Sequence, residues 1–142
     1  MVFYDRDGNP CCYTDDFVHI YSYDGEPLGY IQNEKVWNYD GRYLGLFRNN
    51  WVIDRDGYYL FFTENSTGGP LKPLRRLAPL KSFKRLRPLK SIREIPPIPP
   101  ITSLSWSGRD MKSFFRGEYN LKLSKLSYGV MINVKNITVP EI

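Results

Sequence analysis

This chain of 142 residues has a single histidine, two cysteines and no apolar run of about 18 residues, so we expect no transmembrane helix. With His19 as the only imidazole, no second histidine exists for a metal site and no other conventional base for a nucleophile triad. The two cysteines, Cys11 and Cys12, are neighbours, and adjacent cysteines rarely form a disulfide because the trans peptide holds their Cα atoms about 3.8 Å apart.

Other signatures of chemistry and targeting are also missing. The sequence contains no Gly-x-Gly-x-x-Gly or Walker-type phosphate loop, and no secretory signal pattern follows Met1. Asp15 and Asp16 could imitate a glycosidase pair or a cation site, but nothing else supports either role, and His19 lies in a strand-like stretch typical of a structural residue. We therefore predict a protein that is not an enzyme, uses no cofactor or metal and resides in a reducing cytoplasm.

The most regular feature present is a repeated Asp-Gly pair between aromatic and β-branched residues. The pairs stand 17, 16 and 16 residues apart, at Asp7-Gly8, Asp24-Gly25, Asp40-Gly41 and Asp56-Gly57. Asp-Gly is a strong hairpin signal because a type I′ turn needs φ > 0 at both central residues. Residues 1 to 64 are thus predicted to form four β-hairpins, arranged around a pseudo-fourfold axis or as an open meander.

Two positions of this repeat are apolar in every copy. Three residues before each turn Asp stand Tyr4, Tyr21, Trp37 and Ile53, and four residues after it stand Cys11, Leu28, Leu44 and Leu60. We expect these side chains to point into a shared interior, with four of them buried there: Tyr4, Tyr21, Trp37 and Leu44. Gly29 and Gly45 share one offset and predict a bulge or a close backbone approach.

A second regularity follows in a proline-rich segment, where an apolar residue recurs at every third position. The twelve members are Leu71, Leu74, Leu77, Leu80, Phe83, Leu86, Leu89, Ile92, Ile95, Ile98, Ile101 and Leu104. On an α-helix this stripe would circle the rod, and on a strand it would alternate between faces. A polyproline II helix has three residues per turn and accepts proline, so we predict such a rod, about 100 Å long if straight.

Charge divides the chain into the same parts. Residues 1–69 carry five Lys/Arg against eleven Asp/Glu, residues 70–104 nine against one, and residues 105–142 six against three. The net charges are therefore −6, +8 and +3, and the acidic and basic parts can attract each other. We predict three regions: a four-hairpin head (1–69), an extended basic segment (70–104) and a C-terminal region (105–142).

The C-terminal region is predicted to contain one short helix and two strands. Ser107 with Asp110 resembles a capping box, and Met111, Phe114 and Phe115 would follow on one helical face. Gly117 can end this docking helix. Alternating apolar residues near 119–123 and 130–134 then predict strands.

These residues together resemble the bacterial four-fold β-flower domain proteins. The resemblance rests on FYDRDGNP, YSYDGEPLGYI and WNYDGRYLGLF, then on FFTENSTGGPLKPLRRLAPLKSFKRLRPLKSI, LSWS and the Phe114-Phe115 pair, and it covers residues 3 to 115. It implies a fourfold arrangement of β elements and supplies no catalytic residues. Cys11-Cys12 replace the small or aliphatic residues expected there, and residues 117 to 142 lie outside the resemblance.

Two functional hypotheses come from different classes. In the first, the protein is a structural or interaction module that forms a homo-oligomer or docks a protein partner through the apolar stripe, because an exposed stripe would far exceed the roughly 300–600 Å² tolerated on a monomer. Packing of the stripe on the head, or a disordered linker, are the alternatives. In the second, the segment binds nucleic acid, anionic lipid or an acidic polymer through Lys72, Arg75, Arg76, Lys81, Lys84, Arg85, Arg87, Lys90 and Arg93.

Overall fold

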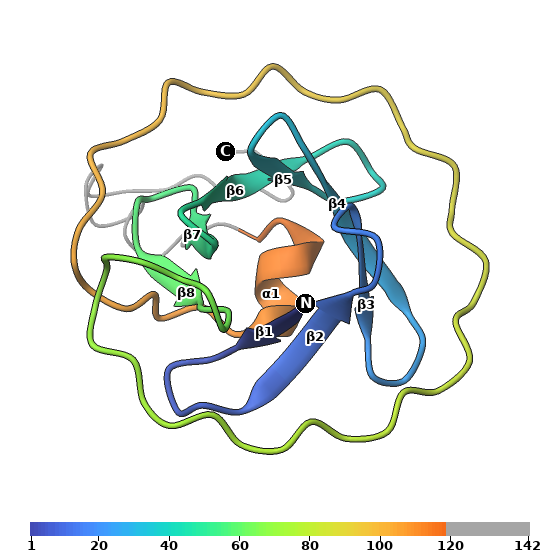
Figure 1. Cartoon of the computed structure of the whole chain (residues 1–142). Helices are drawn as coiled ribbons and strands as arrows, with labels where there is room; N and C mark the ends of the chain where they lie inside the picture. Colours follow the sequence, from blue (N-terminus) through green and yellow to red (C-terminus); the bar gives the residue numbers. More distant parts are fainter. Residues whose placement is uncertain (119–142) are drawn as a thin grey trace, which may run out of the picture.

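Eight antiparallel strands form the head, in a computed structural model that describes residues 1–118. Figure 1 shows them around a central helix. The strands pair in chain order, and Tyr4 pairs with Phe62 to join the last strand to the first, with N–H···O distances of 2.8 and 2.9 Å. The strands are β1 (Val2–Tyr4), β2 (Pro10–Thr14), β3 (His19–Ser22), β4 (Pro27–Gln32), β5 (Lys35–Trp37), β6 (Tyr43–Arg48), β7 (Trp51–Asp54) and β8 (Tyr59–Phe61). The predicted four-hairpin β head is confirmed, in a nearly closed, barrel-like sheet rather than an open meander.

Each hairpin has the same internal register. Phe3 pairs with Cys12 in the first hairpin, and the equivalent pairs are Ile20 with Gly29, Val36 with Gly45 and Val52 with Phe61. The register shifts directly after each of these pairs, as a β-bulge requires. A Cβ atom at Gly29 or Gly45 would overlap a carbonyl oxygen of a neighbouring strand, so the predicted close backbone approach is confirmed.

The four Asp-Gly turns differ from the predicted type I′ form. Only the glycines have positive φ, from 82° to 93°, and the aspartates before them do not. Each glycine N–H donates to the carbonyl three residues earlier, the pattern of a type I turn followed by a left-handed glycine. The reason lies in that earlier residue: the side chains of Asp5, Asn38 and Asp54 accept two backbone N–H groups of the turn, and Ser22 accepts one. Turns with two positive φ values occur instead at Asn33-Glu34 and Asn49-Asn50, between hairpins.

The helix α1 (Met111–Arg116) fills the centre of the ring of strands (Figure 1). Phe114 and Phe115 are 2% and 6% exposed and pack against Phe61 and the other interior side chains. Gly117 ends the helix in a left-handed conformation, as predicted. The cap differs from the prediction, because Asp110 accepts the Ser113 N–H at 2.7 Å whereas Ser107 donates its hydroxyl to Asp54. The strands predicted in 119–134 lie outside the described residues.

The four side chains predicted to lie inside the head are all buried, but on two faces of the sheet. Leu44 belongs to the interior cluster around Phe114. Tyr4 and Trp37 belong to separate clusters, because their strand neighbours Phe3 and Val36 take the inward direction. Tyr21 alternates with the interior residue Ile20 in the same way. The outer face of the sheet is therefore aromatic, and it needs its own cover.

That cover is supplied by residues 70–104, here called the encircling segment. It runs around the outside of the strands as a ring (Figure 1), and it contains no helix or strand. The segment is not a straight rod, because hydrogen bonds to all four Asp-Gly turns bend it around the head. The alternative in which the apolar stripe packs on the head is wrong: eleven of its members are 91–99% exposed, and Leu104 is 71% exposed.

Candidate interaction surface

The encircling segment presents three lines of residues, each made of every third position. The apolar line is the predicted stripe from Leu71 to Leu104. The basic line starts at Lys72 and contains seven of the nine cations: Lys72, Arg75, Lys81, Lys84, Arg87, Lys90 and Arg93. The anchoring line runs from Pro70 to Ser103 and contains the other two cations, Arg76 and Arg85. Each line makes a different kind of contact.

The anchoring line attaches the segment to the head through its backbone. Six of its amides donate to head carbonyls at 2.8–3.0 Å: Arg76 to Gly8, Ser82 to Tyr23, Arg85 to Gly25, Ser91 to Tyr39, Glu94 to Gly41 and Ser103 to Gly57. The remaining six anchoring positions, which have no amide hydrogen, are Pro70, Pro73, Pro79, Pro88, Pro97 and Pro100. Every anchoring residue thus either donates its N–H to the head or is proline, so the segment has one register.

This register matches the fourfold head. Arg76, Arg85, Glu94 and Ser103 stand nine residues apart, and each donates to the glycine of one Asp-Gly turn. The approach is so close that a Cβ atom on Gly8, Gly25 or Gly41 would overlap a carbonyl oxygen of the segment. Glycine is therefore required at these turns for two reasons: the backbone φ is positive, and the encircling segment passes too close for a Cβ atom.

Proline substitutions should destabilise the protein on the anchoring line but not on the basic line. Ser91→Pro removes the N–H that Tyr39 accepts, and we expect it to lower the free energy of unfolding by about 1–3 kcal/mol. The control is Ala78→Pro on the basic line, whose amide makes no backbone hydrogen bond within residues 1–118. Its expected effect is between zero and a gain of about 1 kcal/mol. Equal losses in urea denaturation of the two variants would refute the anchoring role.

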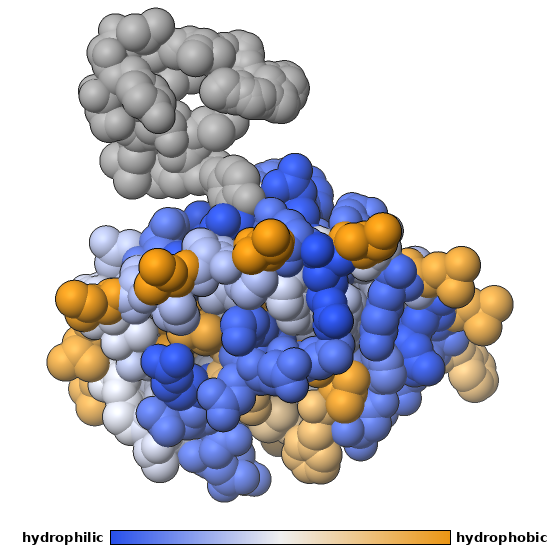
Figure 2. All heavy atoms as spheres, turned by 90° about the horizontal axis from the view of Figure 1, so that it is seen from above, coloured by the Kyte–Doolittle hydropathy of each residue, from blue (hydrophilic) through white to orange (hydrophobic). Residues whose placement is uncertain are grey.

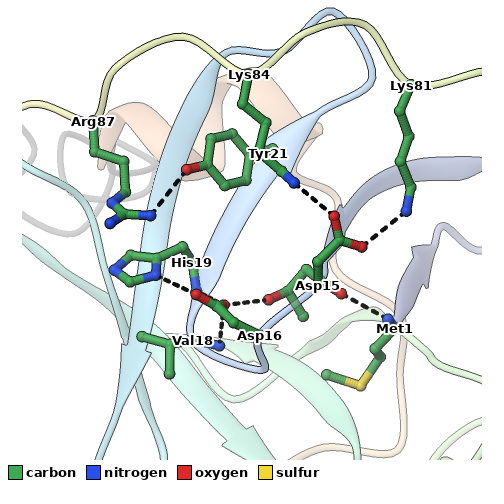
Figure 3. Close-up of polar contacts among 10 residues, drawn as sticks. Met1, Asp15, Asp16, Val18, His19, Tyr21, Lys81, Lys84 and Arg87 are labelled. Carbon is green, nitrogen blue, oxygen red and sulfur yellow. Dashed lines mark hydrogen bonds and ion pairs between the residues drawn. The ribbon is translucent and has the colours of Figure 1, made fainter.

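The basic line points at the head rather than at solvent. Lys81 and Lys84 both bind Asp15, at 2.8 and 2.7 Å, and Arg87 donates to the Tyr21 hydroxyl at 3.2 Å (Figure 3). Arg75 pairs with Glu64 at 2.8 Å. Charge attraction between the basic segment and the acidic head therefore occurs within one chain.

The same cations cover the aromatic outer face of the sheet. Nζ of Lys81 lies 4.4 Å from the ring centre of Tyr13, and Nζ of Lys90 lies 4.3 Å from that of Tyr30. The Arg93 guanidinium lies 5.3 Å from the Trp37 ring, and Arg75 and Lys84 take similar places over Tyr4 and Tyr21. These are cation–π distances. With Lys72 donating to the Ser66 carbonyl at 2.6 Å, all seven basic-line cations contact the head.

The loop between β2 and β3 holds Asp15 in place for Lys81 and Lys84. Asp16 accepts the backbone amides of Val18 and His19 at 2.9 and 2.8 Å, and its other oxygen lies 2.6 Å from Nδ1 of His19 (Figure 3). Burial acts to raise the pKa of Asp16, but these hydrogen bonds, led by that of the His19 ring, hold it well below its usual value. The hydrogen bond predicted for His19 is therefore present, and its structural role stays a prediction.

The lysine pair lowers the pKa of Asp15 below its usual value, first through the hydrogen bond from Lys81 and then through that from Lys84. The stabilisation is present above the unfolded-state value of 3.8 and disappears as the pH falls through the lower folded-state value. We expect the amide exchange rates of Ser82 and Arg85 in that acidic range to exceed the rates extrapolated from neutral pH. Asp15→Asn should show the faster exchange at neutral pH and lose the acid transition, whereas an unchanged transition would contradict the assignment.

The apolar line faces solvent all around the head. Figure 2 shows its side chains as separate protrusions in a row, with hydrophilic surface between and below them. Phe83 is 99% exposed and Leu77 97% exposed. Of the nine predicted anion-binding cations, only Arg76 and Arg85 have side chains without a partner in the described part of the chain.

Residues 1–118 contain a cavity but no cluster of metal-ligating side chains. No group of three or more His, Cys, Asp or Glu side chains there is arranged to hold a metal ion, and no helix there could cross a membrane. A cavity between the first hairpin and the start of α1 is lined by Asp5, Trp106, Arg109 and Asp110 among others. Three of its five charged lining residues are already used: Asp5 orders a turn, Asp110 caps α1, and Arg109 binds Asp56 at 2.9 Å.

The cysteines are free thiols in unreactive surroundings. Burial, followed by the charge of Asp5, raises the pKa of Cys11 to about 12. Burial also raises the pKa of Cys12, which is completely enclosed in the interior cluster. A thiol with a raised pKa is a poor nucleophile near neutral pH.

Comparison with known proteins gives one match. A family model described as "4-fold beta flower protein" matches residues 1–115, which span the four hairpins, the encircling segment and the interior residues of α1. No curated protein and no solved structure matches the chain.

Proposed function

This chain belongs to the 4-fold beta flower family, and we propose that it is a non-enzymatic structural module that holds an apolar ring outward for contact with other protein chains. The head and α1 form the scaffold, and the encircling segment is the contact element. Free Cys11 and Cys12 suit a reducing compartment, which supports a cytoplasmic location. Burial raises the pKa of both thiols, which makes them poor nucleophiles and supports the absence of cysteine-based catalysis.

The observation that carries the proposal is the outward direction of the apolar line. A flexible linker would satisfy its apolar residues by collapse, but here six backbone hydrogen bonds and the basic line hold twelve of them away from the head. An ordered apolar surface of this extent marks an interaction site on a soluble protein. The three-residue period, typical of polyproline II, keeps all twelve on one side of the segment.

The alternative, an anion-binding module, loses support from the same contacts. Seven of its nine candidate cations already bind carboxylates, carbonyls, hydroxyls or aromatic rings of the head. Phosphate binding would have to replace these partners. Only Arg76 and Arg85 remain. Two separated cations make a weak electrostatic site, because nucleic-acid binders with strongly salt-dependent affinity make roughly six to ten phosphate contacts.

Site-specific photocrosslinking in cells tests the proposal. A photoreactive side chain replaces Leu80 in one variant and Ser82, on the anchoring line, in the control. We expect protein adducts from position 80 at several times the yield from position 82. Equal yields from the two positions, or adducts of position 80 with nucleic acid or lipid alone, would overturn the proposed function.

A further inference from the structure

We infer that the partner on the apolar line is a second copy of this chain, and that copies assemble side by side with their apolar lines in contact. This inference rests on the proposed function and names the protein that the ring meets. Four features of the encircling segment lead to it: the shape of the ring, its spacing, its charge and the area that one contact can bury.

The shape of the ring excludes full coverage by one compact partner. The segment passes around all four hairpins (Figure 1), and its apolar residues are exposed along the whole path, from Leu74 at the turn of the first hairpin to Ile101 at the turn of the fourth. A single globular partner touching a convex rim covers one arc and leaves the others in water. Several copies arranged around each ring cover the remaining arcs with no further component.

The spacing of the apolar side chains suits a second ring. Three extended residues at about 3.1 Å each separate neighbouring members by about 9 Å. Side chains on one face of a strand repeat at about 6.6–6.8 Å, and those on a helix face at about 5–6 Å. Neither spacing matches that of the apolar line. Another encircling segment has the same period, and its side chains can enter the gaps between the protrusions seen in Figure 2.

The charge of the rim permits the approach of two copies. The segment carries nine cations and one acid, which would repel a second copy if they faced outward. Seven of the cations instead contact the head, where Asp15 pairs with two of them and Glu64 with a third. The outward side is therefore mainly apolar, and two rims can meet without placing like charges opposite each other, except near Arg76 and Arg85.

The area of one contact determines the kind of assembly. Each hairpin spans nine residues of the segment and therefore three apolar side chains. Three side chains from each copy bury less than the roughly 1,200–2,000 Å² of a stable pair. A dimer should be weak, whereas a copy held by several neighbours is stabilised by multivalency. We expect a steep change from monomers to large planar assemblies as concentration rises.

Cysteine crosslinking distinguishes this arrangement from a dimer. Leu74 and Ile92 lie on the apolar line at the first and third hairpins, half a ring apart. On mild oxidation, Leu74→Cys should give covalent dimers, whereas Leu74→Cys/Ile92→Cys should give a ladder of trimers and larger species. The matched control is Ser82→Cys/Ser103→Cys on the anchoring line, which should give at least tenfold less product. Cys11 and Cys12 remain in every variant.

A ladder from the apolar pair alone would support the inference, and absence of species beyond dimers would overturn it. Sedimentation of the wild type between micromolar and millimolar concentration is the second measurement. Leu77→Ser/Leu80→Ser/Leu86→Ser should abolish the large species while its circular dichroism stays unchanged, and Arg76→Gln/Arg85→Gln should have the smaller effect. Photocrosslinks from position 80 to a different protein, with no ladder, would refute this inference and leave the proposed function standing.

Discussion

Gly25→Ala should lower the free energy of unfolding by about 3 kcal/mol, one of the two largest losses expected for a single substitution here. The left-handed conformation, with φ of 87°, costs an alanine about 1–2 kcal/mol. The added Cβ atom also overlaps the Phe83 carbonyl oxygen, so the segment has to move away from the turn. That movement breaks the hydrogen bond from Arg85 to the Gly25 carbonyl.

Gly68→Ala is the matched control for this prediction. Gly68 also has positive φ, 69°, but nothing lies within 4 Å of an added Cβ atom. Its expected cost is therefore the conformational part alone, about 1–2 kcal/mol. Urea denaturation gives both values, and the difference between them measures the contact of turn and segment. Amide exchange at Ser82 and Arg85 should rise only in Gly25→Ala, and equal effects in the two variants would show that the segment does not depend on the turn.

Phe114→Ala should lower the free energy of unfolding by about 3–5 kcal/mol, because a large side chain leaves the centre of the ring of strands. Phe114 is 2% exposed and packs edge-on against Phe61 and Phe115. The backbone around it is fixed by eight paired strands, so little collapse into the cavity is possible.

Phe83→Ala provides the same chemical change at a 99% exposed position. In dilute solution we expect it to alter the free energy of unfolding by less than about 0.5 kcal/mol. Thermal or urea denaturation below the concentration of assembly makes the comparison. A large loss from Phe83→Ala under those conditions would mean that its side chain is buried within the single chain, contrary to the exposed apolar line.

The parts of the fold predicted from sequence were those set by local chemistry. The four hairpins follow from the Asp-Gly pairs, and the end of α1 follows from Gly117. The turn type was missed because a side chain two residues before each turn Asp competes for the turn amides, as Asp5 does. Which face of the sheet holds Tyr4 was missed because the outer face is covered by a distant segment.

The orientation of the encircling segment was left open between a stripe that meets other chains and one that packs on the head. A three-residue period shows which residues share a side but not which side meets the head. The sequence does contain the missing signal. When the residues of the segment are grouped by every third position, seven cations fall on one line. A second line holds six prolines and the six residues that donate their amides. Proline at non-donating positions, rather than hydrophobicity, indicates the side that faces the head.

The matched registers of head and segment constrain how a gene for such a protein can change. One more hairpin would need nine more residues in the segment, because each turn glycine receives an amide nine positions after the previous one. Duplication of a hairpin alone would leave a ring too short to close. A one-codon deletion near Ser82 would shift all later residues by one line, so that apolar residues would take the anchoring positions and the cations of the basic line would take the solvent-facing positions. Tolerated insertions and deletions within the segment should therefore come in whole triplets of residues, and changes in hairpin number should come with compensating changes of nine.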